Sequence, residues 1–268
     1  MASEPGWLLV YVARAGIFTK GVLYMVVGWL AASAALGSGG RLTGSEGALL
    51  SVLRQPYGRI LLLIAALGLF GYAGWRIAQA IADPDGDGTS AKGLALRASY
   101  AVRGVVHAAL GWQALRLQRG LSVADGGESD AADTLFALPF GESILVLVGL
   151  GLIGYAGFEA WSAWSCRLPR DLDTQRLRAE AGDWAVTVSR FGLAARAVVF
   201  AVIGSTAIQA GLSGSASEMK GTEGALRILS HQQGDAGQWI LAVVGLGLIA
   251  YGFYQLVHSR YLQIRQLT

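Results

Sequence analysis

The sequence predicts an all-α integral membrane protein: six transmembrane helices in three tandem two-helix repeats, with an approximate pseudo-threefold arrangement. Hydrophobic residues make up 53% of its 268 residues, and charged residues only 15%. A soluble domain is about one quarter charged. The apolar residues are gathered into six runs, and these runs recur in three similar units. Together these observations indicate a single membrane domain.

The six apolar runs are each close to the ~20 residues that cross a hydrocarbon core. They cover residues 17–36, 60–82, 100–117, 143–164, 191–212 and 238–257. A helix on the surface of a soluble core shows polar residues every few positions, and these runs barely do. Each run therefore predicts a membrane span.

Three copies of one unit follow each other along the chain, and internal repeats of this kind set the architecture. The offset is 83 residues from the first unit to the second (Arg14 to Arg97, Tyr72 to Tyr155) and 93 to 96 from the second to the third (Arg97 to Arg190, Tyr155 to Tyr251). Each unit has a helix with a basic start, a hairpin and a glycine-rich helix. The predicted repeats are residues 7–84, 92–166 and 184–261, with a cytoplasmic linker at 167–183.

The first and third hairpins contain "SEGALLSVL" and "TEGALRIL". Ser45 and Thr222 are natural N-caps for a short helix, and Glu46 and Glu223 follow them. The leucines lie at helical spacing, so we expect each short helix to lie flat at the outer membrane interface.

The repeated basic start, the Glu-Gly-Ala-Leu hairpin and the Gly-Leu-x-Gly-Tyr-Ala helix resemble the bacterial domain of unknown function 1206 family. The resemblance covers the chain from about Trp7 to Tyr261. It implies a six-helix inner-membrane protein made of three two-helix repeats. It carries over no catalytic residue.

The distribution of basic residues predicts the orientation. Fourteen of the 21 Lys and Arg residues fall near the N-terminus, after the second and fourth runs, or near the C-terminus, and only seven fall in the three opposite hairpins. The positive-inside rule then places both termini in the cytoplasm of a multi-pass protein of the bacterial inner membrane.

Two basic residues begin the first helix of each repeat, six positions apart. The pairs are Arg14 and Lys20, Arg97 and Arg103, and Arg190 and Arg196. In one interpretation they are boundary anchors, the outer residue binding lipid phosphate while the inner one snorkels to the interface. In the other, Lys20, Arg103 and Arg196 converge on the pseudo-threefold axis and form an anion-binding ring.

A polar residue follows the glycine-rich segment of each second helix: Arg76, Glu159 and Gln255. Each lies roughly two helical turns inside the membrane, where a charge needs a partner or water. Arg76 and Glu159 are a candidate ion pair. The alternatives are a structural ion pair that locks the first and second repeats together, or a polar vestibule closed at its cytoplasmic end.

Other motifs favour structural roles. The Gly-x-Gly-x-x-Gly match in "GLGLIGY" (149–155) lies within a span, so it predicts helix packing rather than dinucleotide binding. His107 and His258 are at similar depth, but a haem held by them is disfavoured, and we expect no cofactor and no metal site. Nucleic-acid binding is disfavoured because no segment concentrates Lys and Arg without acids.

No catalytic constellation is found in the sequence. It favours a non-enzymatic structural or accessory subunit, or a lipid-organising element, whose partners are membrane lipids and other membrane-protein subunits. The alternative is a transporter or channel-like protein for a small solute or ion, with its site on the pseudo-threefold axis.

Overall fold

Six long helices dominate the computed structural model, which describes residues 6–84, 86–121, 134–165, 174–231 and 235–261. The long helices are α1 (Gly6–Ala35), α3 (Gly58–Ala82), α4 (Ala91–Gln118), α6 (Gly141–Trp164), α8 (Asp183–Ser213) and α10 (Asp235–Tyr261). The short helices are α2 (Ser45–Leu53), α7 (Thr174–Ala181), the 3₁₀ turn η1 (Ala216–Glu218) and α9 (Thr222–Ser230). Within these ranges all regular secondary structure is helical.

Within the described residues, five helices are long and apolar enough to cross a membrane. These are Tyr11–Ala35, Gly58–Ala82, Gly141–Trp164, Asp183–Ser213 and Ala236–Tyr261. The exception among the six long helices is α4, which has 28 residues but carries Arg103, His107 and Gln113 along its length. The expected sixth span therefore has sufficient length but not the hydropathy of the other five.

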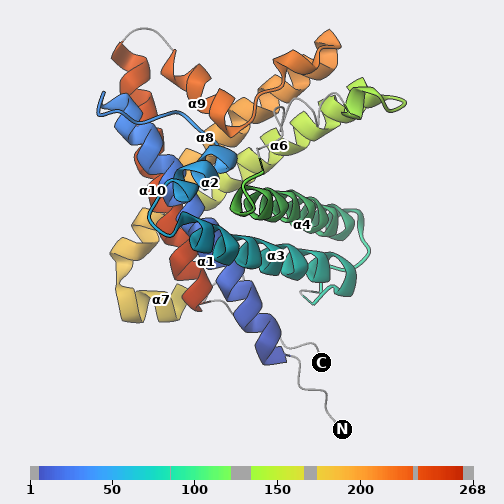
Figure 1. Ribbon diagram of the computed structural model, residues 1–268. Coiled ribbons are helices and arrows are strands. Elements are labelled where there is room, and N and C mark those ends of the chain that lie inside the picture. The colour runs from blue at the N-terminus through green and yellow to red at the C-terminus, as the bar shows by residue number, and fades with distance from the viewer. Residues whose placement is uncertain (1–5, 85, 122–133, 166–173, 232–234, 262–268) are drawn as a thin grey trace.

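Each second helix packs most extensively against the first helix of the next repeat. The pairs are α3 with α4, α6 with α8, and α10 with α1. In Figure 1 the α3–α4 and α6–α8 pairs extend in different directions from the α1–α10 pair. Helix α10 belongs to the third repeat and α1 to the first. The α1–α10 pair therefore joins the last repeat to the first, and each repeat contacts the other two.

Glycines set the distance between paired helices. A Cβ on Gly28 of α1 would lie 2.5 Å from the Gly245 carbonyl oxygen of α10, and a Cβ on Gly149 of α6 would lie 2.7 Å from the Gly204 oxygen of α8. Small residues at such contacts let membrane helices approach closely. The packing role predicted for the glycine-rich segment is thus seen at Gly149.

Contacts inside a repeat also depend on glycine. A Cβ on Gly16 would lie 2.5 Å from the Tyr72 nitrogen, and one on Gly192 would lie 2.3 Å from the Tyr251 nitrogen, so α1 packs on α3 and α8 on α10. The second repeat has Ser99 at this position. Among the described residues α4 and α6 have no comparable helix contact, which is consistent with the larger residue.

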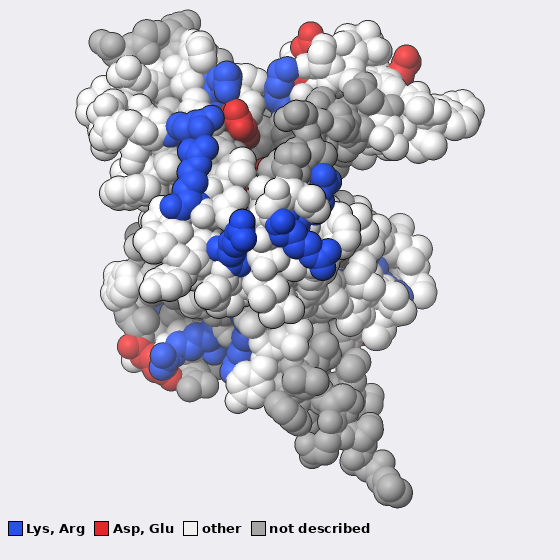
Figure 2. Space-filling view, viewed as in Figure 1, with Lys and Arg blue, Asp and Glu red and all other residues white. Residues whose placement is uncertain are grey.

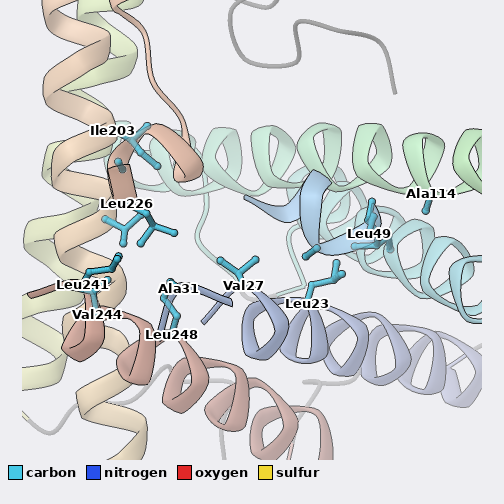
Figure 3. Packing of buried hydrophobic residues seen from close by; sticks show 14 of the residues in the cluster. Leu23, Val27, Ala31, Leu49, Ala114, Ile203, Leu226, Leu241, Val244 and Leu248 are labelled. Carbon is cyan, nitrogen blue, oxygen red and sulfur yellow. The ribbon is translucent and has the colours of Figure 1, made fainter. Parts of the chain in front are cut away.

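The hairpin helices α2 and α9 each pack one face on the core, and their position at the outer interface stays a prediction. Leu49 and Leu226 are fully buried and join a cluster with residues such as Val27 and Leu248 (Figure 3). The N-caps are Gly44 and Gly221, without a side-chain hydrogen bond. The expectation of N-caps at the next residues, Ser45 and Thr222, was therefore wrong, since these begin the helices.

Most of the described face in Figure 2 is uncharged. Over the described molecule as a whole, large hydrophobic side chains such as Leu67, Leu147 and Trp239 are exposed. At the lower left, where α7 lies, acidic and basic side chains are adjacent. Part of the predicted linker 167–183 is this helix, whose Leu177 is fully buried in a hydrophobic cluster with residues of α6, α8 and α10. The preceding linker residues, 167–173, lie outside the described residues.

Candidate functional site

A group of basic, tyrosine and carboxylate side chains lies inside the bundle and is called here the central cluster. Its members are Lys20, Tyr72, Arg76, Arg103, Tyr155, Glu159, Arg196 and Tyr251, contributed by all six long helices. All are buried except Arg103 and Tyr155, which are half-buried. Charged groups inside a membrane-spanning segment are costly and need specific partners.

In each repeat the inner basic residue lies against the tyrosine of its own second helix. The charged group is 5.0 Å from the ring centroid for Lys20 and Tyr72, 4.7 Å for Arg103 and Tyr155, and 4.5 Å for Arg196 and Tyr251. Cation–π contacts of this length are attractive, and more so when desolvated. The same contact therefore recurs three times.

Each of these tyrosines also packs on the next repeat. Its partner there is the aromatic residue that lies one helical turn after the inner basic residue of that next repeat. The ring centroids are 4.5 Å apart for Tyr72 and His107, 5.6 Å for Tyr155 and Phe200, and 4.7 Å for Tyr251 and Tyr24. The third contact joins the last repeat to the first. The rings thus link all three repeats.

Hydrogen bonds connect the charges to the tyrosine hydroxyls. Lys20 Nζ and Arg76 Nε both donate to the Tyr72 hydroxyl, over 3.3 Å and 2.9 Å. The Tyr155 hydroxyl donates to Glu159 Oε1 over 2.6 Å. Arg196 is ion-paired with this same carboxylate. The hydroxyls of Tyr72 and Tyr155 therefore each lie beside a charged group of their own helix.

The polar position of the second helices lies inside the bundle in all three repeats. Glu159 forms its ion pair with Arg196, rather than with Arg76 as the sequence suggested, and Arg76 NH1 donates to Gln79 Oε1 over 2.7 Å. Gln255 is buried beside α1, where a Cβ on Gly21 would lie 3.1 Å from it. The ion pair therefore joins the second and third repeats, and the expected lock between the first and second was wrong.

The outer basic residues hold helix ends rather than only facing lipid. Arg97 donates to the carbonyl oxygens of Ala80 and Ile81 over 2.8 Å and 3.0 Å. At the equivalent place Arg190 donates to Ala163 and Trp164 over 2.6 Å and 3.2 Å. These carbonyls end the helix of the preceding repeat, where a cation is favourable. Arg14 is half-buried at the third such position.

The loop after α3 places an acidic residue, Asp83, beside Arg97. The Asp83 carboxylate accepts hydrogen bonds from the Gly88 and Asp87 amides over 2.8 Å each, and these bonds hold its pKa below the ordinary value. Arg97 NH1 lies 3.9 Å from Asp83 Oδ2, and its positive charge also lowers the Asp83 pKa. The Asp-Gly segment thus forms a turn around Asp83.

An apolar layer lies beside the central cluster on the hairpin side. Three residues beyond the cluster, in that direction, lie Leu23, Leu69, Val199 and Leu248, all in the main hydrophobic core. Leu49 and Leu226 of the hairpin helices belong to the same core. In the second repeat the equivalent residues are Leu152, which is partly buried, and Val106, which is 50% exposed, so the layer is formed mainly by α1, α3, α8 and α10.

Two buried atoms of the cluster have no hydrogen-bond partner among the described residues: Glu159 Oε2 and Arg196 Nε. An orphaned buried acceptor or donor costs about 1–3 kcal/mol unless a bound group satisfies it. The ion pair therefore keeps one unmet acceptor and one unmet donor.

The histidines and hairpin acids are placed separately. His107 Nδ1 lies 2.8 Å from the Arg103 carbonyl oxygen, and His258 stacks on Tyr254 at 5.7 Å. Glu46 accepts a hydrogen bond from Gln113 over 2.7 Å, and Glu223 pairs with Arg227 on the surface. Among the described residues no three potential ligands gather into a metal site; that the protein uses no haem stays a prediction.

The fold and the cluster define an all-helical multi-pass membrane protein made of three two-helix repeats, with basic and tyrosine side chains buried between them. The chain belongs to the family described as Domain of Unknown Function (DUF1206), whose sequence model matches residues 15–83, 98–165 and 191–262. This confirms the family and the three repeats expected from the sequence.

A curated relative is the uncharacterized protein YxxB of Bacillus subtilis (strain 168). It is 33% identical over 250 residues, which cover 92% of this chain and 89% of the relative. No solved structure matches the chain. The relatedness thus extends over nearly the whole of both chains.

Proposed function

We propose that the protein is a six-span bundle of the bacterial inner membrane, with both termini in the cytoplasm and with approximate pseudo-threefold symmetry. The tyrosine contacts that recur from repeat to repeat support the symmetry. The pairing of α4 with α3 supports a sixth span. The excess of Lys and Arg at one end supports the orientation.

We further propose that the central cluster binds a small oxyanion, a carboxylate or a phosphate. One observation carries the proposal: the cluster holds four basic side chains, from Lys20, Arg76, Arg103 and Arg196, and one carboxylate, from Glu159. Buried like charges repel one another unless an anion compensates them. An anion bound among them therefore stabilises the cluster, as the cluster stabilises the anion.

The chemistry of the cluster suits an oxyanion. Guanidinium groups present paired donors that match carboxylate and phosphate oxygens. The orphaned Arg196 Nε is one such donor. Arg103, whose recorded contacts are with the Tyr100 and Tyr155 rings, is half-buried on α4, the helix without close packing on α6. We therefore propose that the anion reaches the cluster from the cytoplasmic end, beside α4.

We propose a transport-type role for this binding, without enzymatic chemistry or a cofactor. A site within the membrane-spanning part, sealed on one side by an apolar layer, is the arrangement that alternating access requires. The apolar layer and the hairpin helices then form the closed gate of this state.

A structural or accessory role is the second candidate, with lipids or other membrane subunits as partners. It is favoured by the outer face of α6, where Phe158 and Trp161 are 63% and 61% exposed and a Cβ on Gly151 would meet no atom within 4 Å. A partner helix fits such a face closely. A subunit of this kind needs no anion for stability.

Thermal unfolding in detergent distinguishes the two candidates. Sodium phosphate and sodium succinate are titrated at constant ionic strength into the wild type, Arg103→Gln and the surface control Arg227→Gln. A ligand at 100 times its dissociation constant stabilises the folded state by about 2.7 kcal/mol. We expect at least one anion to raise the unfolding temperature of the wild type and R227Q, but not of R103Q. Equal responses in all three proteins would contradict the proposal.

A further inference from the structure

A groove of about 800 Å³ runs along the outer contact of α6 and α8. Its walls are mainly small apolar residues, including Ala156 and Ala160 of α6 and Ala194 and Ala197 of α8. Both helices are candidate membrane spans, so the groove is at the depth of the lipid chains. It lies outside the central cluster.

The α3–α4 interface keeps alanine at four of the six equivalent positions, Ala73, Ala80, Ala101 and Ala108, but both other interfaces differ from this one at the pair Ala160 and Ala197. At the positions equivalent to Ala160 and Ala197, the α3–α4 pair has Ile77 against Gly104, and the α10–α1 pair has Leu256 against Gly21. A Cβ on these glycines would lie 2.8 Å from Ile77 and 3.0 Å from Leu256. A large aliphatic side chain therefore fills the space that is open beside Ala160.

Arg190 and Trp164 line the end of the groove that lies toward the linker. Arg190 Nε and NH2 are held by the carbonyl oxygens of Ala163 and Trp164. No hydrogen bond of Arg190 NH1 is recorded within the described part of the chain. The half-buried guanidinium is therefore held at this end of the groove, and its NH1 group can still donate a hydrogen bond to a ligand.

We propose that this groove binds one anionic phospholipid, with an acyl chain along the alanines and the phosphate beside Arg190. Hydrocarbon is the solvent at this depth, and an apolar groove there excludes water. A basic residue between transmembrane helices at the cytoplasmic boundary attracts an anionic headgroup. This goes beyond the oxyanion proposal because ligand, depth and residues all differ.

Native mass spectrometry tests the assignment. The purified full-length protein is equilibrated in mixed micelles with equal amounts of phosphatidylglycerol and phosphatidylcholine, and retained phospholipids are counted. Ala160→Ile introduces the residue that the first repeat has at the equivalent position, Ile77, and fills the groove. We expect at least a fivefold lower occupancy of the tightest lipid in A160I.

Arg190→Gln tests the headgroup, and Arg97→Gln is the matched control, because both remove two hydrogen bonds to the end of a preceding helix. We expect R190Q to lose the preference for phosphatidylglycerol and R97Q to keep it. Ala194→Leu fills the groove from its exposed wall and replaces A160I if that variant fails to fold.

Two results would overturn the assignment. One is a folded groove-filling variant, monodisperse and with wild-type helicity, that retains as much lipid as the wild type. The other is an R190Q protein that still prefers phosphatidylglycerol, or that loses this preference no more than R97Q does. Neither result bears on anion binding by the central cluster, which the response to phosphate reports separately.

Discussion

Arg196 of α8 and Glu159 of α6 form a buried ion pair that joins the third repeat to the second. The side chains are only 7% and 4% exposed. In the first repeat the position of Glu159 is held by Arg76, and in the third by Gln255. The cluster thus has one acidic position among three equivalents, and this asymmetry makes its charge predominantly basic.

Removing that carboxylate is expected to destabilise the protein strongly. Breaking a buried pair by neutralising one partner costs about 3–5 kcal/mol, because the other charge is left uncompensated. We expect Glu159→Gln to lower the free energy of unfolding by an amount in this range, measured by denaturation in detergent. The exposed pair of Glu223 and Arg227 gives the control: E223Q changes stability by less than about 1 kcal/mol. Similar effects of the two substitutions would show that the buried pair is not a lock.

The close helix contacts predict opposite effects for two glycines. A Cβ at Gly28 would lie 2.5 Å from a backbone oxygen, whereas one at Gly151 would meet nothing within 4 Å. We expect Gly28→Ala to destabilise by about 1–3 kcal/mol through overpacking. Gly151→Ala is expected to be neutral, or to stabilise by up to about 1 kcal/mol through helix propensity. Thermal unfolding of both variants measures the difference, and an equal effect would argue against the α1–α10 contact.

The turn after α3 predicts a pH dependence. The folded protein lowers the Asp83 pKa below its ordinary value of 3.8, so the ionised carboxylate stabilises the fold above that pH. This stability is lost as the pH falls through the folded pKa. We expect Asp83→Asn to lower the unfolding temperature at pH 7, and the difference from wild type to shrink below about pH 4. A constant difference from pH 7 to pH 3 would exclude the carboxylate as its cause.

The proposed entry from the cytoplasmic end predicts one-sided access to the cluster. In a Cys166→Ser background, which removes the single cysteine, we expect Arg103→Cys to react with a membrane-impermeant thiol reagent only in inverted vesicles. Ser38→Cys, on an exposed turn between α1 and α2, is expected to react only in right-side-out vesicles. Labelling of both cysteines from the same side would contradict the topology and the direction of access.

Much of the architecture follows from the sequence because membrane spans and repeats leave periodic patterns. The offsets of Arg14, Tyr72 and their equivalents define the three units, and each predicted run lies within or close to a long helix of the structure. Helix starts were less predictable. For example, α8 begins at Asp183, well before the apolar run at 191–212, because a helix continues past the hydrocarbon boundary into polar residues.

The partners of the cluster residues were not predictable from spacing alone. The repeats identify Lys20, Arg103 and Arg196 as equivalent, but they leave open whether these residues anchor the helices in lipid or converge inside the bundle. That each lies against a tyrosine of its own repeat depends on how the helices cross, which glycine contacts such as Gly16 with Tyr72 determine. The helix-capping role of Arg97 likewise needs the preceding helix to end beside it.

Direct binding of an oxyanion to the purified protein tests the central claim. Isothermal titration calorimetry with phosphate and with succinate is carried out on the wild type, R103Q and R227Q in the same detergent at constant ionic strength. The proposal predicts saturable binding of at least one anion near one per chain, unchanged in R227Q and at least tenfold weaker in R103Q. Absence of binding by both anions in the wild type, or equal binding in R103Q, would contradict it.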